Sequence, residues 1–332
     1  MKSKSIADFV FVGYGQIAKR HIDILKSKSK KMKIGVVSNH ASDADLKNAH
    51  GDNVFIMKPR KAFSCEMSKF IVITSPSSDH LNDIKLLKNM RLTTILIEKP
   101  IAKNSKQGSQ ILNMIKDTNS QAFVLYNLRF SNGLKKMISL LSTKKYGNLL
   151  YAKAFVGQDL AQWRQPAADI KNTISARKET GGGVLRELSH ELDYLSLIFD
   201  EINLKSAVLT NTKYFEIDVE DTAFLVLAAS YKGKAIPISL IQDFVRPDKT
   251  RELELVCEDA TLFWNLYEGR IAVHEPGGRV DLIFDDCEDL TKTYFNMWTS
   301  VLYDDFGAFC TCDEALKHLQ LIETAESMQI GN

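Results

Sequence analysis

A histidine stands between two carboxylates in a segment with helical periodicity. Glu187 and Asp193 lie three residues before and three residues after His190, and three consecutive glycines, 181–183, precede the segment. A neighbouring carboxylate can fix the tautomer of an imidazole and raise its basicity, which suits general acid–base chemistry. The glycines would let a ligand approach the backbone closely. A solvent-facing amphipathic helix has a similar pattern, so periodicity alone does not establish this role for His190.

A lysine at the end of a predicted strand is the second reactive group. An apolar run ends in Glu98, and Lys99 and Pro100 follow it directly. In an open parallel sheet, ligands bind beyond the carboxyl ends of the strands. Lys99 would therefore point toward the ligand crevice, whereas a lysine without such surroundings would be an ordinary surface residue.

The N-terminal segment has the pattern of a dinucleotide-binding turn. A short apolar run leads into Gly-Tyr-Gly-Gln-Ile-Ala, and an amphipathic segment follows at once. Gly13 permits the tight turn, Gly15 lets the backbone approach a pyrophosphate, and Ala18 keeps the helix close to the sheet. The N–H groups that open the helix, around Gln16 and Ile17, can bind phosphate. This strand–turn–helix context predicts a dinucleotide cofactor.

A polar turn after a later strand would also contact this cofactor. Its small polar residues can wrap the cofactor with backbone and hydroxyl groups, and they are Thr74, Ser75 and Pro76. Ser78 or Asp79 would cap the helix that follows. We interpret His80 as a residue at the start of that helix, near the cofactor, rather than as a catalyst.

The turn after the second strand bears on the form of the cofactor. NAD-specific versions of this fold place a carboxylate there for the ribose 2′-hydroxyl. This chain instead has Ser38, Asn39 and His40, and the first acid is Asp43. Ser38 and Asn39 could hydrogen-bond a 2′-phosphate, but no arginine is present to clamp one. The residues of this turn favour NADP, and NAD stays the alternative.

The first third of the chain alternates strands with helices. Strands are predicted at 8–12, 33–37, 53–57, 70–74, 94–98 and 122–126, and helices at 16–26, 79–90 and 105–118. Such alternation indicates a parallel sheet with helices on both faces. We therefore predict an α/β chain that begins with a doubly wound Rossmann domain over residues 1–126.

The pattern changes after residue 126. Helices fit 131–142 and 184–199, a strand fits 149–157, and strand-like runs follow at 204–213, 219–231, 235–244, 250–257, 260–265 and 270–274. Successive strands without helices between them indicate a mainly antiparallel sheet. Two helices near 294–310 and 313–329 close the chain. These elements predict an α+β domain over 127–332 that binds substrate and mediates oligomerisation.

The spacing of apolar residues along the chain assigns the faces of these helices and strands. In the helix over 184–199, one face is apolar and the other gathers Arg186, Glu187, His190, Asp193 and Tyr194. In the large sheet, alternating apolar positions lie on a face that no predicted helix covers, and they are Leu225, Leu227, Ile236, Ile238 and Leu240. An uncovered apolar face predicts packing against another subunit in a homo-oligomer.

Bulk properties exclude several classes of protein. The 332 residues are 45% hydrophobic and 25% charged, and the net charge of +2 argues against a nucleic-acid binder. No segment has the length of a membrane helix, and the N-terminus lacks a signal-peptide pattern. The five cysteines show no metal-binding spacing, so we expect no metal site, and reduced thiols indicate a cytoplasmic protein.

Taken together, these motifs resemble the glucose–fructose oxidoreductase/inositol dehydrogenase (Gfo/Idh/MocA) family. The motifs that occur in the family's order are the Gly-x-Gly turn, Thr-Ser-Pro-x-x-x-His, Glu98-Lys99-Pro100, Tyr126-Asn127-Leu-Arg129-Phe130, Trp163-Arg164 and the glycines before His190. Many members place an Asp four residues before this His, where Arg186 stands here. The variant Arg-Glu-Leu-Ser-His-Glu-Leu-Asp resembles a branch linked to bacterial surface-sugar biosynthesis.

The resemblance implies roles for individual residues. Lys99 would polarise the reacting hydroxyl and His190 would be the acid–base group, with Glu187 and Asp193 as its carboxylates. The peptide bond before Pro100 would be cis. Glu98 would belong to the cofactor site, and four residues would line the cleft around cofactor and substrate, namely Asn127, Arg129, Trp163 and Arg164.

The function implied is NAD(P)-dependent hydride transfer at a secondary hydroxyl or keto carbon of a sugar or nucleotide-linked sugar. The alternative is a non-catalytic NAD(P)-binding regulator, because a fungal transcriptional repressor shares the family's fold. The presence of both Lys99 and His190 favours the enzyme.

Overall fold

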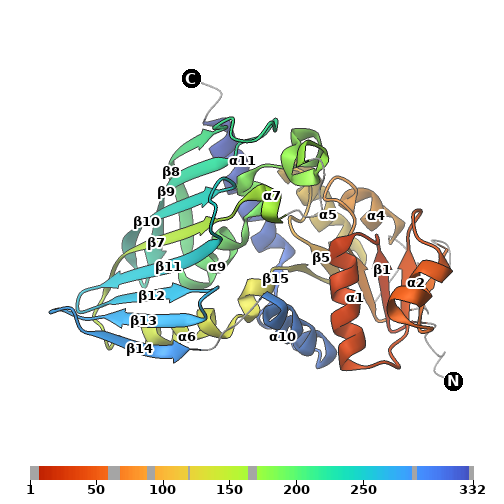
Figure 1. Cartoon of the computed structure of the whole chain (residues 1–332), viewed down its shortest axis with the longest axis horizontal. Coiled ribbons are helices and arrows are strands. Elements are labelled where there is room, and N and C mark those ends of the chain that lie inside the picture. Colours follow the sequence, from red (N-terminus) through yellow and green to blue (C-terminus); the bar gives the residue numbers. More distant parts are fainter. Residues whose placement is uncertain are drawn as a thin grey trace. The chain divides into compact units, whose positions relative to one another are not determined.

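The computed structural model describes residues 7–58, 68–87, 94–118, 120–163, 170–285 and 290–328 (Figure 1). Contacts divide the chain into two units, Met1–Tyr126 with Trp298–Lys317, and Asn127–Met297 with His318–Asn332. The sequence had placed all of 127–332 in the second domain. Residues 298–317 group with the first unit because a short strand at Cys310–Thr311 pairs with the edge of its sheet.

The first unit contains the predicted doubly wound sheet. Its strand order is β15-β6-β5-β4-β1-β2-β3, with every pairing parallel except that of β15 with β6. The strands are β1 Phe9–Val12, β2 Ile34–Val37, β3 Val54–Ile56, β4 Phe70–Ile73, β5 Thr94–Glu98, β6 Gln121–Leu125 and β15 Cys310–Thr311. The strand order reverses direction at β1 and β4, which is where ligands bind in such sheets.

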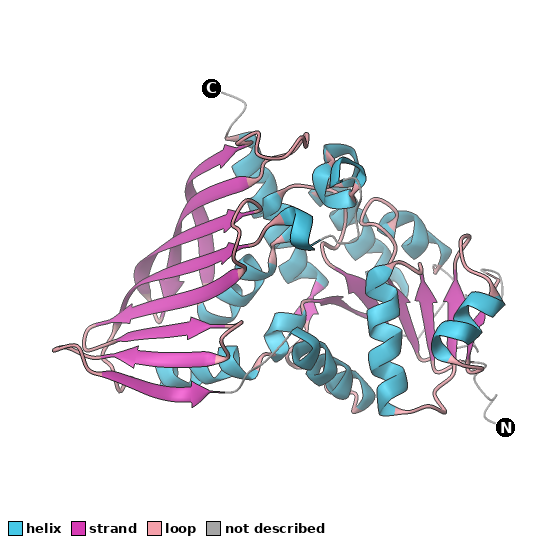
Figure 2. Cartoon of the chain, viewed as in Figure 1, coloured by secondary structure: helices cyan, strands magenta, loops and turns pink. Residues whose placement is uncertain are grey.

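Helices alternate with these strands (Figure 2). They are α1 Gln16–Lys28, α2 Asp43–His50, α4 His80–Leu86 and α5 Ser105–Thr118. Helix α2 was not predicted from the sequence. A capping box between Ser42 and Asp45 begins this helix, but Leu46 is its only buried residue, so no apolar period marks it.

The second unit is built on an eight-stranded sheet of order β14-β13-β12-β11-β7-β10-β9-β8. All pairings are antiparallel except that of β10 with β7. The strands are β7 Leu149–Gly157, β8 Glu201–Thr210, β9 Thr222–Tyr231, β10 Lys234–Asp243, β11 Thr250–Cys257, β12 Thr261–Asn265, β13 Arg270–His274 and β14 Val280–Asp285. The mainly antiparallel sheet is confirmed, and β14 is an additional edge strand.

The remaining helices include one correction. The helix predicted over 184–199 is two helices, because the chain leaves helical geometry at Leu188, whose ψ is 32°. These are α8 Val184–Glu187 and α9 His190–Ile198. The others are α6 Asn132–Ser142, α7 Leu160–Trp163, α10 Leu290–Leu302, α11 Cys312–Ser327 and 3-10 turns at Asn127–Phe130, Ile170–Asn172, Ile174–Ala176 and Lys178–Thr180. No helix among the described residues is long and apolar enough to cross a membrane.

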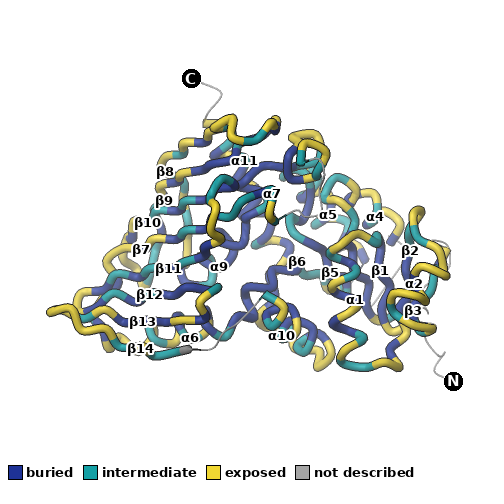
Figure 3. Tube along the Cα trace, in the orientation of Figure 1, coloured by how far each residue is buried: buried dark blue, intermediate teal, exposed yellow. Residues whose placement is uncertain are grey.

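The face assigned to the large sheet was wrong. The five apolar residues named for an uncovered face, Leu225 to Leu240, are all buried, and α6, α8 and α9 contact this sheet. The exposed face carries the alternate residues, among them Phe224 and Val226, which are 50% and 52% exposed. Buried and exposed positions alternate along the strands of this sheet (Figure 3). A period of two separates the faces of a strand but does not say which one helices cover.

Candidate cofactor and catalytic site

The glycine turn after β1 has the geometry expected of a phosphate cradle. Gly13 has a φ of +99°, and a Cβ there would lie 2.7 Å from the backbone nitrogen of Ser75, so only glycine fits. A Cβ on Gly15 would meet no atom of the described residues within 4 Å. Helix α1 begins at Gln16, and no side chain of the described part caps it. Free space at Gly15, next to N–H groups that no side chain caps in the described structure, suits a pyrophosphate.

The turn after β4 is tied to this glycine turn. The Thr74 hydroxyl donates to the carbonyl oxygens of Val12 and Gly13, at 3.0 and 3.2 Å. The Ser75 hydroxyl donates to Asp83, whose pKa is raised by burial. Asp79 precedes α4 without a side-chain capping bond in the described structure, so it does not fill the predicted capping role. The two turns form one continuous edge beside the switch point of the sheet.

His80 lies inside the protein rather than on a cofactor surface. Its Nδ1 is 3.1 Å from the carbonyl oxygen of Ile101, and its Nε2 is 2.9 Å from that of Ser75. Burial lowers the pKa of His80, although the two carbonyls oppose this effect. His80 therefore links the turn after β4 to the loop after β5.

The Glu98-Lys99-Pro100 motif lies at the carboxyl end of β5. The Lys99–Pro100 peptide bond is cis, and Lys99 is partly exposed. Glu98 was predicted to belong to the cofactor site, but its carboxylate faces protein groups. Oε1 is 2.7 Å from Nε2 of His21 on α1, and Oε2 accepts from the backbone N–H of Lys99 at 3.2 Å.

The turn after β2 is open at the residues that bear on cofactor form. Asn39 and His40 are exposed, and the Ser38 hydroxyl oxygen accepts from the backbone N–H of His40 at 3.1 Å. The preference for NADP over NAD stays a prediction.

A polar chain on the glycine turn was not predicted from the sequence. The hydroxyl of Tyr14, the residue between the two glycines, lies 2.8 Å from Nε2 of His50 on α2. Nδ1 of His50 lies 2.8 Å from the Asp23 carboxylate on α1. Burial and the charge of Asp23 raise the pKa of Tyr14. The sequence held one sign of this chain, which is the tyrosine between the two glycines. The backbone geometry of the turn does not require an aromatic ring there, so its hydroxyl group could have been expected to have a partner.

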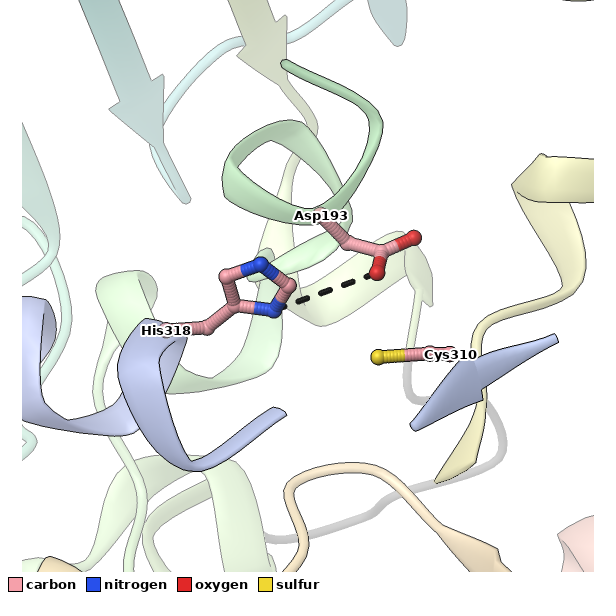
Figure 4. A group of neighbouring side chains, drawn as sticks. All are labelled: Asp193, Cys310 and His318. Carbon is pink, nitrogen blue, oxygen red and sulfur yellow. Dashed lines mark ion pairs between the residues drawn. The ribbon is translucent and has the colours of Figure 1, made fainter. Parts of the chain in front are cut away.

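In the second unit, α9 presents His190 as its first residue, and Asp193 follows one turn later. Asp193 is fully buried and binds the guanidinium of Arg129, with Nε 2.9 and 3.0 Å from the two carboxylate oxygens. Figure 4 shows the His318 imidazole beside the same carboxylate, with Nδ1 3.8 Å from Oδ1. Arg129 was predicted to line a cleft, and it anchors α9 instead.

The carboxylates near α8 have different surroundings. Glu187 is partly exposed, whereas Arg186 forms a bidentate ion pair with Glu326 on α11, both distances being 2.7 Å. Glu220 lies nearby and is partly buried, and desolvation of its carboxyl group raises its pKa to about 7. Its carboxylate accepts from the backbone N–H of Leu185 at 3.3 Å.

The glycines before α8 make room for the protein itself. A Cβ on Gly182 would lie 2.5 Å from the backbone oxygen of Ser175, and one on Gly183 would lie 2.4 Å from the Glu220 carboxylate. Gly183 also has a φ of +114°. A ligand was predicted to approach the backbone closely at these glycines. At Gly182 and Gly183 protein atoms make this close approach instead.

The last predicted cleft residues are packed within the second unit or lie outside the described residues. The Asn127 amide is buried and donates to the Thr293 hydroxyl at 2.6 Å. The ring centroid of Trp163 is 5.9 Å from that of Phe244. Arg164 lies outside the described residues.

Comparison with known proteins is consistent with this organisation. No curated protein matches the sequence. Among solved structures, the super-repressor mutant of Gal80p from Saccharomyces cerevisiae is 15% identical, with a TM-score of 0.81 over 98% of this chain and 96% of that one. The WlbA dehydrogenase from Bordetella pertussis, in complex with NADH and UDP-GlcNAcA, is 17% identical, with a TM-score of 0.75 over 99% and 97% of the two chains.

A third similar structure is GnnA from Acidithiobacillus ferrooxidans, a UDP-N-acetylglucosamine 3-dehydrogenase. It is 13% identical, with a TM-score of 0.73 over 98% of each chain. At these identities the likeness shows a shared fold. Residues 7–126 match the model of the Gfo/Idh/MocA oxidoreductase family, which is described by its NAD-binding Rossmann fold, so this N-terminal domain is of that family's type.

Proposed function

We propose that this protein transfers hydride between a nicotinamide dinucleotide and a secondary hydroxyl or keto carbon of a sugar or nucleotide-linked sugar. The observation that carries the proposal is the placement of Lys99, which follows β5 at the ligand edge of the sheet and whose backbone N–H is bonded to Glu98. The UDP-sugars named for the WlbA and GnnA structures support the nucleotide-linked class.

Each reactive side chain has a separate task in this proposal. The dinucleotide, when bound, accepts or donates the hydride. The Lys99 ammonium binds the reacting oxygen and stabilises the negative charge that develops on it during oxidation. The His190 imidazole takes the hydroxyl proton in oxidation and returns it in reduction. The cofactor's pyrophosphate would lie on the N–H groups at Gln16 and Ile17.

The carboxylates near His190 differ in what they offer. Asp193 is buried against Arg129, so we assign it to the orientation of α9. Glu187 is partly exposed on α8 and is our candidate for the carboxylate that tunes the imidazole. Arg186 forms an ion pair with Glu326. It therefore does not take the role of the aspartate that many family members have at this position.

A non-catalytic NAD(P)-binding regulator is the second candidate, and the similarity to the Gal80p structure favours it. The two candidates differ in their need for Lys99 and His190. A regulator that only senses the dinucleotide uses neither group for chemistry, whereas the enzyme loses its turnover without them.

A substrate screen read by NAD(P)H absorbance tests the proposal. Free sugars, polyols and UDP-sugars are offered in both directions with NAD(H) and NADP(H). We expect turnover with at least one UDP-sugar and a preference between the two dinucleotides. Tight dinucleotide binding without turnover across the whole panel would favour the regulator.

We also propose that the exposed face of the large sheet joins two copies of the chain. Cross-strand register aligns a row of apolar side chains across four strands, formed by Val208, Phe224, Ile241 and Phe155. Such a row of large apolar residues on a solvent-facing sheet is typical of an interface. Phe224→Glu should convert the protein to a monomer in light scattering, whereas a wild-type monomer at micromolar concentration would contradict the proposal.

A further inference from the structure

A buried imidazole holds the residue before Lys99. His21 lies on the inner side of α1 and is fully buried, and its Nε2 is 2.7 Å from Oε1 of Glu98. The other oxygen of this carboxylate accepts from the backbone N–H of Lys99 at 3.2 Å. A carboxylate with one oxygen on an imidazole and the other on the next backbone N–H cannot rotate without losing one of the two bonds.

A tryptophan fixes the tautomer of this imidazole. Nε1 of Trp298 lies 2.9 Å from Nδ1 of His21. An indole N–H only donates, so Nδ1 of His21 must accept, and Nε2 carries the proton that is donated to Glu98. The Trp298 ring also packs at 5.5 Å from the Phe9 ring, which keeps the indole in place. The polar chain therefore runs from Trp298 through His21 and Glu98 to the backbone of Lys99.

A second buried imidazole holds the residue after Pro100. Nδ1 of His80 lies 3.1 Å from the carbonyl oxygen of Ile101 and Nε2 lies 2.9 Å from that of Ser75, and the neutral ring, which burial favours, donates to one of the two while packing against the other. It therefore links the loop that carries Lys99 to the turn that touches Gly13 through Thr74. Both ends of the segment 98–101 are thus fixed to protein interior, although the lysine between them is partly exposed.

We propose that His21 and His80 are positioning residues that fix the direction of Lys99, with Trp298 setting the tautomer of His21. Neither imidazole contacts the reacting atoms. Their effect is to hold a cationic side chain where charge develops, and a displacement of about 1 Å at such a group can cost on the order of 10²-fold in rate. The expected kinetic effect rests on the proposed role of Lys99. The contacts that hold segment 98–101 through His21, Trp298 and His80, which we call the clamp, belong to the first unit alone.

The test combines amide hydrogen exchange of the peptide that contains Lys99 with steady-state kinetics. His21→Leu removes both polar contacts, His21→Gln keeps a side-chain N–H donor for Glu98, and Trp298→Phe keeps the packing but removes the indole donor. Ile22→Val, at the buried neighbour on α1, is the matched control for a general loss of stability.

We expect the amide of Lys99 to exchange roughly tenfold faster in His21→Leu. The variant removes the bond between His21 and Glu98, so the carboxylate that accepts from the Lys99 N–H is held less firmly. His80→Leu removes the contacts with the carbonyl oxygens of Ile101 and Ser75, and it should raise exchange in the same peptide by loosening the backbone after Pro100. His21→Gln should restore most of the protection, Trp298→Phe should give a smaller increase, and Ile22→Val should change nothing at this peptide. On the substrate found in the screen, kcat of His21→Leu should fall by about 10²-fold, with dinucleotide affinity kept within a few-fold.

The clamp is overturned if exchange at Lys99 in a folded His21→Leu or Trp298→Phe protein equals that of Ile22→Val. Failure of the proposed function has a different signature. In that case exchange at Lys99 would change as described, while Lys99→Met would keep its turnover. If His21→Leu lowers kcat equally in the presence and absence of Lys99, the imidazole does not act through the lysine, and the positioning role is excluded.

Discussion

Each unit of this protein buries a carboxylate close to a proposed reactive group, and the two carboxylates have different partners. Glu98 precedes Lys99 and binds an imidazole through one oxygen, which leaves the other oxygen for the lysine backbone. Asp193 follows His190 by one turn and binds the fork of Arg129 through both oxygens. The first arrangement positions a backbone, and the second anchors a helix.

The difference follows from the chemistry of the partners. A guanidinium presents several N–H groups in a fixed plane and stays charged at any ordinary pH, so it can occupy a whole carboxylate. An imidazole offers one N–H in the tautomer that Trp298 selects. Removing either partner should therefore have different consequences in the two units.

The largest effect is expected from breaking the ion pair in the second unit. Asp193→Leu leaves the Arg129 charge buried without its carboxylate, and such a loss costs about 3–5 kcal/mol of unfolding free energy. Replacing both partners, with Asp193→Leu and Arg129→Met, should recover much of that cost. Urea unfolding measures the cycle, and Asp281→Asn, in an exposed ion pair with Arg279, is the control that should cost less than about 1 kcal/mol. A double variant as unstable as the sum of the singles would contradict this assignment.

A comparable effect on rate, but not on stability, is expected at His190. His190→Asn should lower kcat by about 10²–10⁴-fold, because the hydroxyl proton loses its acceptor. In the oxidation direction, the fall in kcat/KM on the acidic side should disappear in this variant, since protonation of His190 no longer matters. Dinucleotide titration should show unchanged affinity. An acidic limb that persists in His190→Asn would assign the proton transfer to another group.

A smaller effect concerns the pH dependence of stability through Glu220. Burial raises the pKa of this carboxyl from its ordinary 4.5 to about 7, so the folded state holds its proton more tightly than the unfolded chain. The stabilisation is fully present below about pH 4.5 and is lost as pH rises to about 7, at no more than about 1.4 kcal/mol per pH unit.

Glu220→Gln should therefore flatten the stability profile between those pH values and make the variant relatively more stable at pH 8. Thermal unfolding across this range measures the difference from wild type. Glu201→Gln, at an exposed position on β8, is the matched control and should leave the profile unchanged. Parallel profiles for wild type and Glu220→Gln would show that this carboxyl is ionised in the folded protein throughout.

Local patterns in the sequence predicted most of the first unit. The strands of its parallel sheet are short apolar runs, and Gly13 has the backbone geometry that its motif requires. Partners that come from distant parts of the chain could not be predicted in this way. Trp298 contacts His21 across 277 residues and Arg129 contacts Asp193 across 64, and no local spacing carries either contact.

The second unit shows the limit of face assignment. Periodicity identified the alternating residues around Leu225 but assigned them to the uncovered face, because coverage depends on where helices pack and not on the strand itself. The same limit applies to Asp193. A regular helical wheel placed it with His190 on a polar face, whereas the interruption at Leu188 separates α8 from α9 and Asp193 is buried on Arg129.

The most direct test of the proposed enzyme is Lys99→Met, compared with wild type and with Lys85→Met, an exposed lysine on α4. Turnover is followed by NAD(P)H absorbance on the substrate found in the screen, and dinucleotide affinity by NAD(P)H fluorescence. Loss of the cation at the developing alkoxide should lower kcat by about 10²–10³-fold, with affinity changed by no more than a few-fold. Near-normal kcat in Lys99→Met would contradict the account.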